Sequence, residues 1–297
     1  MNPYYNKDSL VYHNGAIVKA LGTSTQLYSQ TLHYGNGIFE GIRAYKTTFG
    51  TKIFKARAHY KRLKKGAEVM DIPFNYSVEE LIKITYELLK QNNYEDAYIR
   101  PLITTGADMS LKTSDESVLT IQCWKWGKYM GDKLLRVKTS KFQRPNPKSC
   151  YVDAKVTGHY INSILSANEA KKAGYDEALL LDMNENVAES SGANVFMQKG
   201  NILITPKVGH IMPGITRKVV VDLCKEEGIK VEERDFRLQE LKTADSAFFT
   251  GTAAEVVGLK SLDDYQFPLD WNKSLGKKLM HLYKQEVLCE RKELVKV

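Results

Sequence analysis

The sequence predicts an α+β protein with two lobes, each built from a mixed or antiparallel sheet with flanking helices. Its 297 residues exceed the roughly 100 to 200 residues that one hydrophobic core usually holds. The composition, with 43% hydrophobic, 10% aromatic and 26% charged residues, is that of an ordinary globular protein. Hairpin signals and helical patterns alternate irregularly along the chain, which argues against a doubly wound parallel sheet.

The first lobe is predicted to span residues 1–127 and to open with a hairpin. Asn14-Gly15 lies between two apolar runs, and this dipeptide supplies the positive φ angles of a tight two-residue turn. Ser77 and Glu80 form the signature of a capping box, and apolar residues recur after them at helical spacing. The predicted helices of this lobe cover 60–70 and 77–90, and its further predicted strands cover 98–105 and 118–126.

Residues 128–140 are predicted to form an interdomain loop, because apolar patterning weakens there while glycine and charge increase. The larger second lobe, residues 141–297, restarts with a helix that Gly174 ends. A hairpin is predicted around Lys199-Gly200, between two apolar runs. The other predicted elements are strands over 177–182, 229–236 and 246–250 and helices over 159–173, 216–227 and 272–288.

Composition and patterning also narrow the functional classes. No stretch reaches the roughly 20 apolar residues that span a bilayer, and the segment from Met1 to Leu10 is polar, so we expect a cytoplasmic protein without a membrane partner. The four cysteines lie far apart and form no C-x-x-C pair. This spacing predicts reduced thiols and no metal site.

The formal net charge of +8 raises the alternative of a basic nucleic-acid-binding protein. Its main support is the segment 133–148, which holds six basic residues and no acidic one. A solvated linker, or a positive field that attracts an anionic cofactor and substrate, explains the same residues. Elsewhere basic and acidic residues are interleaved without an aromatic stacking pattern, so we expect no nucleic-acid partner.

Several common catalytic motifs are absent from the sequence. The segment from Gly35 to Gly41 has a final glycine spacing one residue too long for a dinucleotide loop, and no strand–helix–strand unit surrounds it. The sequence has no G-K-S/T phosphate loop, no H-E-x-x-H zinc motif and no G-x-S-x-G nucleophile elbow. Nucleotide hydrolysis, zinc hydrolysis and α/β-hydrolase chemistry therefore lack their usual signatures.

Lys155 is the leading candidate for covalent chemistry. It lies between Ala154 and Val156-Thr-Gly158, directly before a predicted helix, among small and weakly charged residues. Such surroundings favour the neutral amine that Schiff-base chemistry requires. From the residue pattern alone, a solvated surface lysine is the commoner interpretation.

Separate segments place polar or small residues in apolar surroundings, and these are 33–43, 97–102, 154–160, 189–196, 213–217 and 251–255. In this order and at these spacings they resemble the fold-type IV pyridoxal-phosphate enzymes, the D-amino acid aminotransferase-like fold. The segments from Phe39 to Arg43 and from Tyr98 to Leu102 resemble specifically the branched-chain amino acid aminotransferases. The resemblance runs from Leu10 to Phe267.

The resemblance implies pyridoxal 5'-phosphate as the cofactor, bound between the lobes mainly by the larger one. It implies that Lys155 holds this cofactor as a Schiff base and moves the proton at the substrate Cα. Glu189 is implied to pair with the pyridine nitrogen, and Tyr160 to hydrogen-bond the phenolic oxygen. Helix N-termini, small-residue turns and arginine side chains bind phosphate groups. The resemblance implies that the cofactor phosphate is bound by Arg62, Ile215, Thr216 and Thr252.

The implied reaction is a reversible ping-pong transfer of the amino group of leucine, isoleucine or valine to 2-oxoglutarate, in branched-chain amino acid biosynthesis. One pocket must then accept an aliphatic side chain and the γ-carboxylate of glutamate. The resemblance assigns to substrate binding Tyr34, Phe39, Gly41, Arg100, Tyr129 and the Thr252-Ala253 amides. Members of this fold build the site at a dimer interface, so we expect at least a homodimer, with a hexamer as the alternative, and Tyr34 reaching the neighbouring subunit's pocket.

Two enzymes that share this fold and the lysine are alternatives: a D-amino acid aminotransferase and an aminodeoxychorismate lyase. The segments from Phe39 to Arg43 and from Tyr98 to Leu102 argue against both, because they match the branched-chain pattern. The nucleic-acid-binding hypothesis predicts salt-dependent retention on nucleic acid and no bound chromophore.

Overall fold

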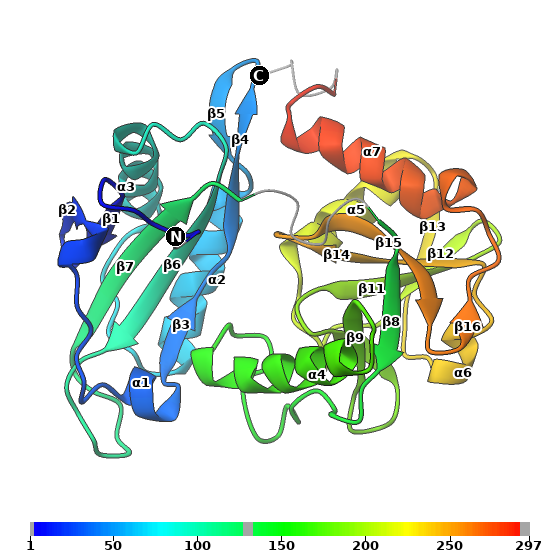
Figure 1. Ribbon diagram of the computed structural model, residues 1–297, viewed down its shortest axis with the longest axis horizontal. Coiled ribbons are helices and arrows are strands. Elements are labelled where there is room, and N and C mark those ends of the chain that lie inside the picture. Colours follow the sequence, from blue (N-terminus) through cyan, green and yellow to red (C-terminus); the bar gives the residue numbers. More distant parts are fainter. Residues whose placement is uncertain (1–2, 127–132, 292–297) are drawn as a thin grey trace. The chain divides into compact units, whose positions relative to one another are not determined.

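The computed structural model describes residues 3–126 and 133–291. The chain forms two compact units. The first unit comprises Met1–Gly127 together with Ala154–His159, and the second comprises Lys128–Asp153 and Tyr160–Val297. Each unit combines helices with a sheet of its own (Figure 1).

The first unit contains an antiparallel sheet with strand order β2-β1-β7-β6-β4-β5, on which β3 pairs with β6. The predicted hairpin at Asn14-Gly15 is confirmed, since these residues have φ angles of 45° and 97° and join β1 to β2. The strands are β1 Leu10–His13, β2 Ala16–Lys19, β3 Gly37–Phe39, β4 Ile42–Thr47, β5 Gly50–Ile53, β6 Ala97–Thr105 and β7 Ser117–Trp124.

Two helices, α2 Ala56–Val69 and α3 Val78–Gln91, cover one face of this sheet (Figure 1). The capping box predicted at the start of α3 is confirmed, because Ser77 accepts from the Glu80 N–H and Glu80 accepts from the Ser77 N–H. Successive residues of a strand face opposite sides, so Ile99 points into the core under these helices while Tyr98 and Arg100 lie on the other face. Two shorter elements, η1 Ala20–Gly22 and α1 Gln30–Tyr34, precede β3.

The second unit has a mixed sheet with strand order β10-β9-β8-β15-β14-β11-β12-β13, and β16 pairs with β15. An additional pairing of β10 with β11, at Glu189 and Asn194, closes the strands from β10 to β11 into a ring. The strands are β8 Leu135–Thr139, β9 Glu177–Leu181, β10 Val187–Ser190, β11 Asn194–Lys199, β12 Ile202–Thr205, β13 Lys230–Glu233, β14 Ser246–Gly251, β15 Glu255–Leu262 and β16 Tyr265–Gln266.

Helices and 3₁₀ turns complete both units. They are η2 Thr157–His159 in the first unit and α4 Tyr160–Lys172, α5 Ile215–Glu226, α6 Leu238–Leu241, η3 Trp271–Lys273 and α7 Leu275–Val287 in the second. The core of the second unit is formed by apolar side chains from the ring strands, among them Val137, Val195 and Phe249.

The structure corrects the prediction of an interdomain loop over 128–140, because β8 occupies 135–139 between β9 and β15. Leu135 and Val137 point into the core while Arg136 is exposed. The charged residues of this segment are therefore the exposed positions of a strand and not part of a linker. The strands β3, β4, β5, β10 and β15 were also not predicted.

Candidate active site

The segment that carries Lys155 is held against β3 in the first unit. The backbone N–H of Phe39 donates to the Lys155 carbonyl at 3.1 Å, and Ile38 forms a bridge with Val156. Ala154 and Val156 are buried on either side of Lys155, which is itself half-buried. The lysine is therefore a fixed part of the first unit and not a solvated surface residue.

Two glycines allow this segment to approach so closely. Gly35 has a φ of 71°, and a Cβ atom there would lie 2.4 Å from the Gly158 Cα. The Gly35 carbonyl accepts hydrogen bonds from the Gly158 N–H and the Thr157 hydroxyl, at 3.0 and 2.7 Å. Any side chain at Gly35 would push the Lys155 segment away from β3.

The ring of Phe39 lies beside both Lys155 and Arg100. Its centroid is 5.4 Å from the Lys155 Nζ and 4.7 Å from the Arg100 Cζ. Arg100 also donates from Nη2 to the Tyr98 hydroxyl at 3.0 Å. An amine and a guanidinium thus lie beside one aromatic ring, and a guanidinium is a group that pairs well with carboxylates.

Gly41 leaves the space that the Tyr98 hydroxyl occupies. A Cβ atom at this position would lie 2.0 Å from that oxygen. Tyr98 is buried and orients Arg100, so Gly41 contributes to the pocket by leaving room for another side chain. Tyr98 was not predicted as a site residue, although its place two residues before Arg100 puts both on one face of the strand.

Arg62 is held by a buried carboxylate. Its Nε and Nη2 donate to Glu40 at 2.6 and 3.0 Å, and His59 Nδ1 lies 2.8 Å from Glu40 Oε2. Burial raises the pKa of the Glu40 carboxyl, but the charge of Arg62 and the contacts of His59 outweigh it and hold this pKa well below its usual range. Burial, together with the charges of Arg62 and Lys155, lowers the pKa of His59. The cluster therefore contains a charged Glu40–Arg62 pair beside a neutral histidine.

In the second unit, the Glu189 carboxylate is held by an ion pair and two hydrogen bonds. Arg144 Nε lies 2.8 Å from Oε1, the Met212 N–H donates to the same oxygen at 3.1 Å, and Asn194 Nδ2 donates to Oε2 at 2.9 Å. Glu189 is buried. The carboxylate is consequently oriented and charge-compensated before any ligand binds.

The start of α5 lies beside this carboxylate. Asn194 Nδ2 also donates to the Met212 carbonyl at 2.9 Å, and a Cβ atom on Gly214 would lie 2.0 Å from Asn194 Oδ1. Gly214 is the N-cap of α5, no side chain caps the helix there, and its first turn has no acidic residue. The first amides of α5, at the predicted residues Ile215 and Thr216, so form an anion-binding helix terminus next to Glu189.

The other predicted residues of the second unit lie at element ends. Thr252 and Ala253 are in the turn that joins β14 to β15, and both are half-buried. Thr250, opposite Asn194 on β11, has a buried hydroxyl without a hydrogen-bond partner among the described residues. Tyr160 is the first residue of α4.

Of the two tyrosines assigned to substrate binding, the structure describes Tyr34 but not Tyr129. Tyr34 ends α1, is exposed, and donates from its hydroxyl to the Met109 carbonyl at 3.2 Å. Tyr129 lies outside the residues that the structure describes.

Comparison with known proteins identifies the family. The model of the amino-transferase class IV family matches residues 37–262. This chain belongs to that family. A branched-chain-amino-acid aminotransferase of Pseudomonas aeruginosa is 38% identical over 98% of this chain and 99% of its own.

Solved structures of class IV aminotransferases have the same fold. The branched-chain aminotransferase of Thermoproteus uzoniensis, with norvaline, aligns with a TM-score of 0.93 at 33% identity over 97% of both chains. The branched-chain amino acid aminotransferase of Thermobaculum terrenum, in its PLP-form, aligns with a TM-score of 0.91 at 27% identity over 97% of this chain and 96% of its own. The predicted α+β fold of type IV is confirmed.

Three basic residues of the segment 133–148 form ion pairs within this class IV aminotransferase. Lys133 and Arg136 form ion pairs with Asp176 at 2.6 and 3.4 Å, and Arg144 pairs with Glu189. Arg144 was missed as a site residue, since 45 positions separate it from Glu189 and no spacing rule links them. Within the described residues, the helices are all too short or too polar to cross a membrane.

Proposed function

We propose that this protein is a branched-chain amino acid aminotransferase that uses pyridoxal 5'-phosphate and carries it on Lys155. The observation that supports this most is the Phe39 ring, which has the Lys155 amine 5.4 Å away and the Arg100 guanidinium 4.7 Å away. An aliphatic side chain packs on such a ring, whereas the γ-carboxylate of glutamate pairs with the arginine.

The residues of both units fit this cofactor. Its aldehyde needs an amine, its ring nitrogen a carboxylate and its phosphate several donors. Lys155, the anchored Glu189 and the uncapped start of α5 supply these groups, and the unpartnered Thr250 hydroxyl adds a polar atom beside Asn194. Arg62 retains its proposed role at the phosphate, although Glu40 already binds it through two nitrogens.

When bound, the cofactor supplies the electron sink that stabilises negative charge at the substrate Cα. With the cofactor bound, Lys155 would hold it through its amine and, once displaced by the substrate, would act as the base that carries the substrate Cα proton. Glu189, held by Arg144 and Asn194, keeps the ring nitrogen protonated. We assign Tyr160 to the phenolic oxygen.

Substrate recognition is assigned to both units. Phe39 and Gly41 shape the apolar wall, and Arg100 with Tyr34 and Tyr129 receives the γ-carboxylate. The amides of the Thr252-Ala253 turn receive the α-carboxylate, and Ile215, Thr216 and Thr252 receive the phosphate. Arg100 forms no ion pair with the substrate side chain when the substrate is leucine, isoleucine or valine.

We also propose a homodimer. Exposed apolar side chains gather on α1 and the loop near Met109, which are joined by hydrogen bonds from Gln30 to the Ser110 and Lys112 carbonyls. They are Leu27, Tyr28, Leu32, Tyr34, Met109 and Leu111, the last 92% exposed. A patch of this kind is typical of an interface, and Tyr34 within it would serve the partner's site. Sedimentation of wild type and a Leu111→Glu variant tests this: a variant as dimeric as the wild type would exclude the patch.

We place the enzyme in the cytoplasm, in accord with its four free cysteines. Its activity is tested by following glutamate formation from 2-oxoglutarate with leucine, isoleucine or valine, and pyruvate formation from D-alanine in parallel. Turnover of the three L-amino acids with little activity on D-alanine supports the proposal. Turnover of D-alanine alone would assign the chain to the D-amino acid branch of the family.

A further inference from the structure

The face of the first sheet opposite α2 and α3 holds a cavity of about 530 Å³ that Arg100 lines. Strands β6 and β7 pair so that Arg100 faces Gln122 and Tyr98 faces Trp124. Tyr4, Gln122, Trp124 and Trp126 line the cavity together with Arg100, whereas neither Phe39 nor Lys155 belongs to its lining. This volume lies in the range of small-molecule sites.

Two of the residues that line this cavity each carry a buried donor that has no acceptor among the described residues. The Nε of Arg100 and the Nε1 of Trp124 are buried and make no hydrogen bond to any of the described residues. Trp124 itself is only 8% exposed. In the register of β6 and β7 the two residues are diagonal neighbours, about 7 to 8 Å apart at the backbone, so both stand on the same face of the sheet. A carboxylate suits both, because one donor is cationic.

The other walls of the cavity are aromatic. The rings of Tyr4 and Trp124 meet edge to face at 5.4 Å, and Trp124 and Trp126 lie 5.6 Å apart. Flat apolar groups pack well on such rings. We propose that the cavity is a second ligand site, for an aromatic monocarboxylate, and that its ligand controls Arg100.

The effect of the ligand on Arg100 follows from the position of this residue, and it rests on the proposed function. One side of Arg100 lies on Phe39, and its Nη2 is bonded to Tyr98. A carboxylate bound at Nε neutralises the guanidinium and weakens its attraction for the γ-carboxylate of 2-oxoglutarate or glutamate. Leucine has no second carboxylate, so its reaction is unaffected. The ligand is therefore an inhibitor selective for the dicarboxylate half-reaction.

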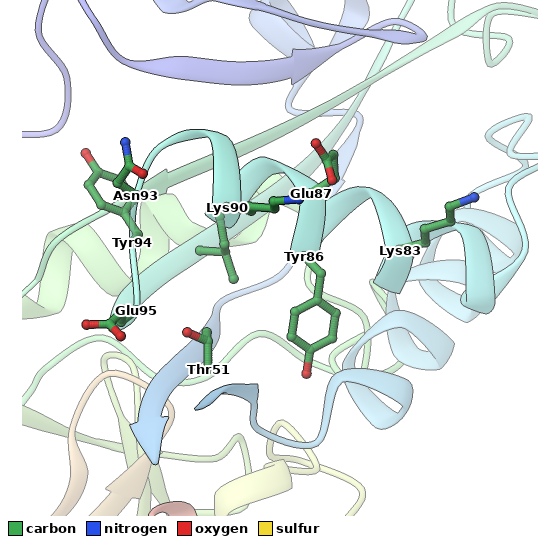
Figure 2. A pocket seen from close by; sticks show the side chains of 9 residues that line it. Thr51, Lys83, Tyr86, Glu87, Lys90, Asn93, Tyr94 and Glu95 are labelled. Carbon is green, nitrogen blue, oxygen red and sulfur yellow. The ribbon is translucent and has the colours of Figure 1, made fainter. Parts of the chain in front are cut away.

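A larger hollow on the same unit lacks these features. It measures about 1020 Å³ and is lined by α3, the turn after it and Thr51 of β5 (Figure 2). Its charges are of both signs, with Lys83 and Lys90 beside Glu87 and Glu95. Tyr86 accepts from the Ile53 N–H at 3.2 Å. Among the described residues, no side chain that lines this hollow has a buried polar atom without a hydrogen-bond partner. The hollow therefore offers no unsatisfied donor for a ligand, unlike the cavity that Arg100 lines.

Calorimetric titration of the holoenzyme with phenylacetate, and with neutral phenylacetamide, tests the site. We expect phenylacetate to bind at least about tenfold more tightly than the amide. Trp124→Phe keeps an aromatic ring but removes the N–H, and should weaken phenylacetate binding about tenfold. Trp271→Phe, in the second unit, should leave it unchanged. Equal binding of acid and amide, or no effect of Trp124→Phe, would overturn the proposal.

Kinetics separate this site from the substrate pocket. Phenylacetate should raise the KM for 2-oxoglutarate several-fold and leave the single-turnover reaction with leucine unchanged. Equal competition with leucine would place phenylacetate on Phe39 and overturn the proposal. If the protein had no transaminase activity but bound phenylacetate in a Trp124-dependent way, the function would fail and the binding site would stand.

Discussion

Two buried glutamates, one in each unit, show what sets the charge of a carboxyl inside this protein. Glu40 is bonded to Arg62 and His59, and the cationic partner keeps its pKa low despite complete burial. Glu177 in β9 accepts from the Ser191 hydroxyl and the Ala178 N–H, both at 2.7 Å, and burial raises its pKa. Burial alone therefore favours the neutral form, and a buried arginine reverses it.

Glu189, like Glu40, has an arginine partner, because Arg144 lies 2.8 Å from its carboxylate. An ionised carboxylate is what a protonated ring nitrogen requires as its partner. We therefore propose that the arginine-paired glutamate of the second unit carries the catalytic charge.

The largest expected effect comes from removing that charge. Glu189→Gln keeps the size of the side chain but no longer stabilises the protonated ring, so kcat should fall about 10²- to 10³-fold. Steady-state assays with leucine and 2-oxoglutarate measure it. Glu185→Gln, at an exposed turn before β10, is the matched control and should retain activity. Full activity of Glu189→Gln would remove Glu189 from the mechanism.

The next effect concerns the stability that the Glu40–Arg62 pair provides. Glu40→Gln leaves a buried arginine without its counter-charge and should lower the free energy of unfolding by about 3 to 5 kcal/mol, measured by urea denaturation at pH 7. The folded-state pKa of Glu40 is depressed, so its contribution is present above the unfolded pKa of about 4.3 and is lost as pH falls below it.

The difference between wild type and Glu40→Gln should accordingly shrink in acid. Glu79→Gln, which breaks an exposed ion pair with Arg57, is the control and should have no measurable effect. A Glu40→Gln variant as stable as this control would mean that the buried pair contributes nothing.

The smallest effect is expected at Glu177, and it has the opposite sign. The pKa of Glu177 is raised in the folded state. Its contribution to the free energy of unfolding is therefore complete below the unfolded-state pKa and is lost as pH rises through the folded-state pKa. Glu177→Gln imitates the neutral form, and should become the more stable protein, relative to wild type, as pH rises from 5 to 8. Parallel pH dependence of both proteins would show that Glu177 is already ionised.

Local chemistry made part of the fold predictable from sequence. The Asn14-Gly15 turn and the capping box of Ser77 and Glu80 depend on residues next to each other in the chain. β8 escaped prediction because its exposed positions are basic and it pairs in parallel with distant strands. Such pairings leave no signal in the strand itself.

The residues of the candidate site can likewise be divided into those that the sequence predicts and those that only the structure reveals. Lys155, Glu189 and Arg100 stand in motifs that a resemblance identifies. The contacts that support these residues are not identified in this way, since Arg144 lies outside the motifs and the contact of Gly35 with Gly158 joins two motifs far apart in the chain. Such contacts are created by the fold, and only the structure reveals them.

The most direct test of the account is the absorption spectrum of the purified protein with pyridoxal phosphate, for wild type and Lys155→Ala, before and after leucine. We predict a long-wavelength band in the wild type that survives gel filtration and is bleached by leucine. Lys155→Ala should lose this band on gel filtration. A variant that retained the band and its response to leucine would contradict the assignment of Lys155, and a wild type without any band would contradict the proposed cofactor.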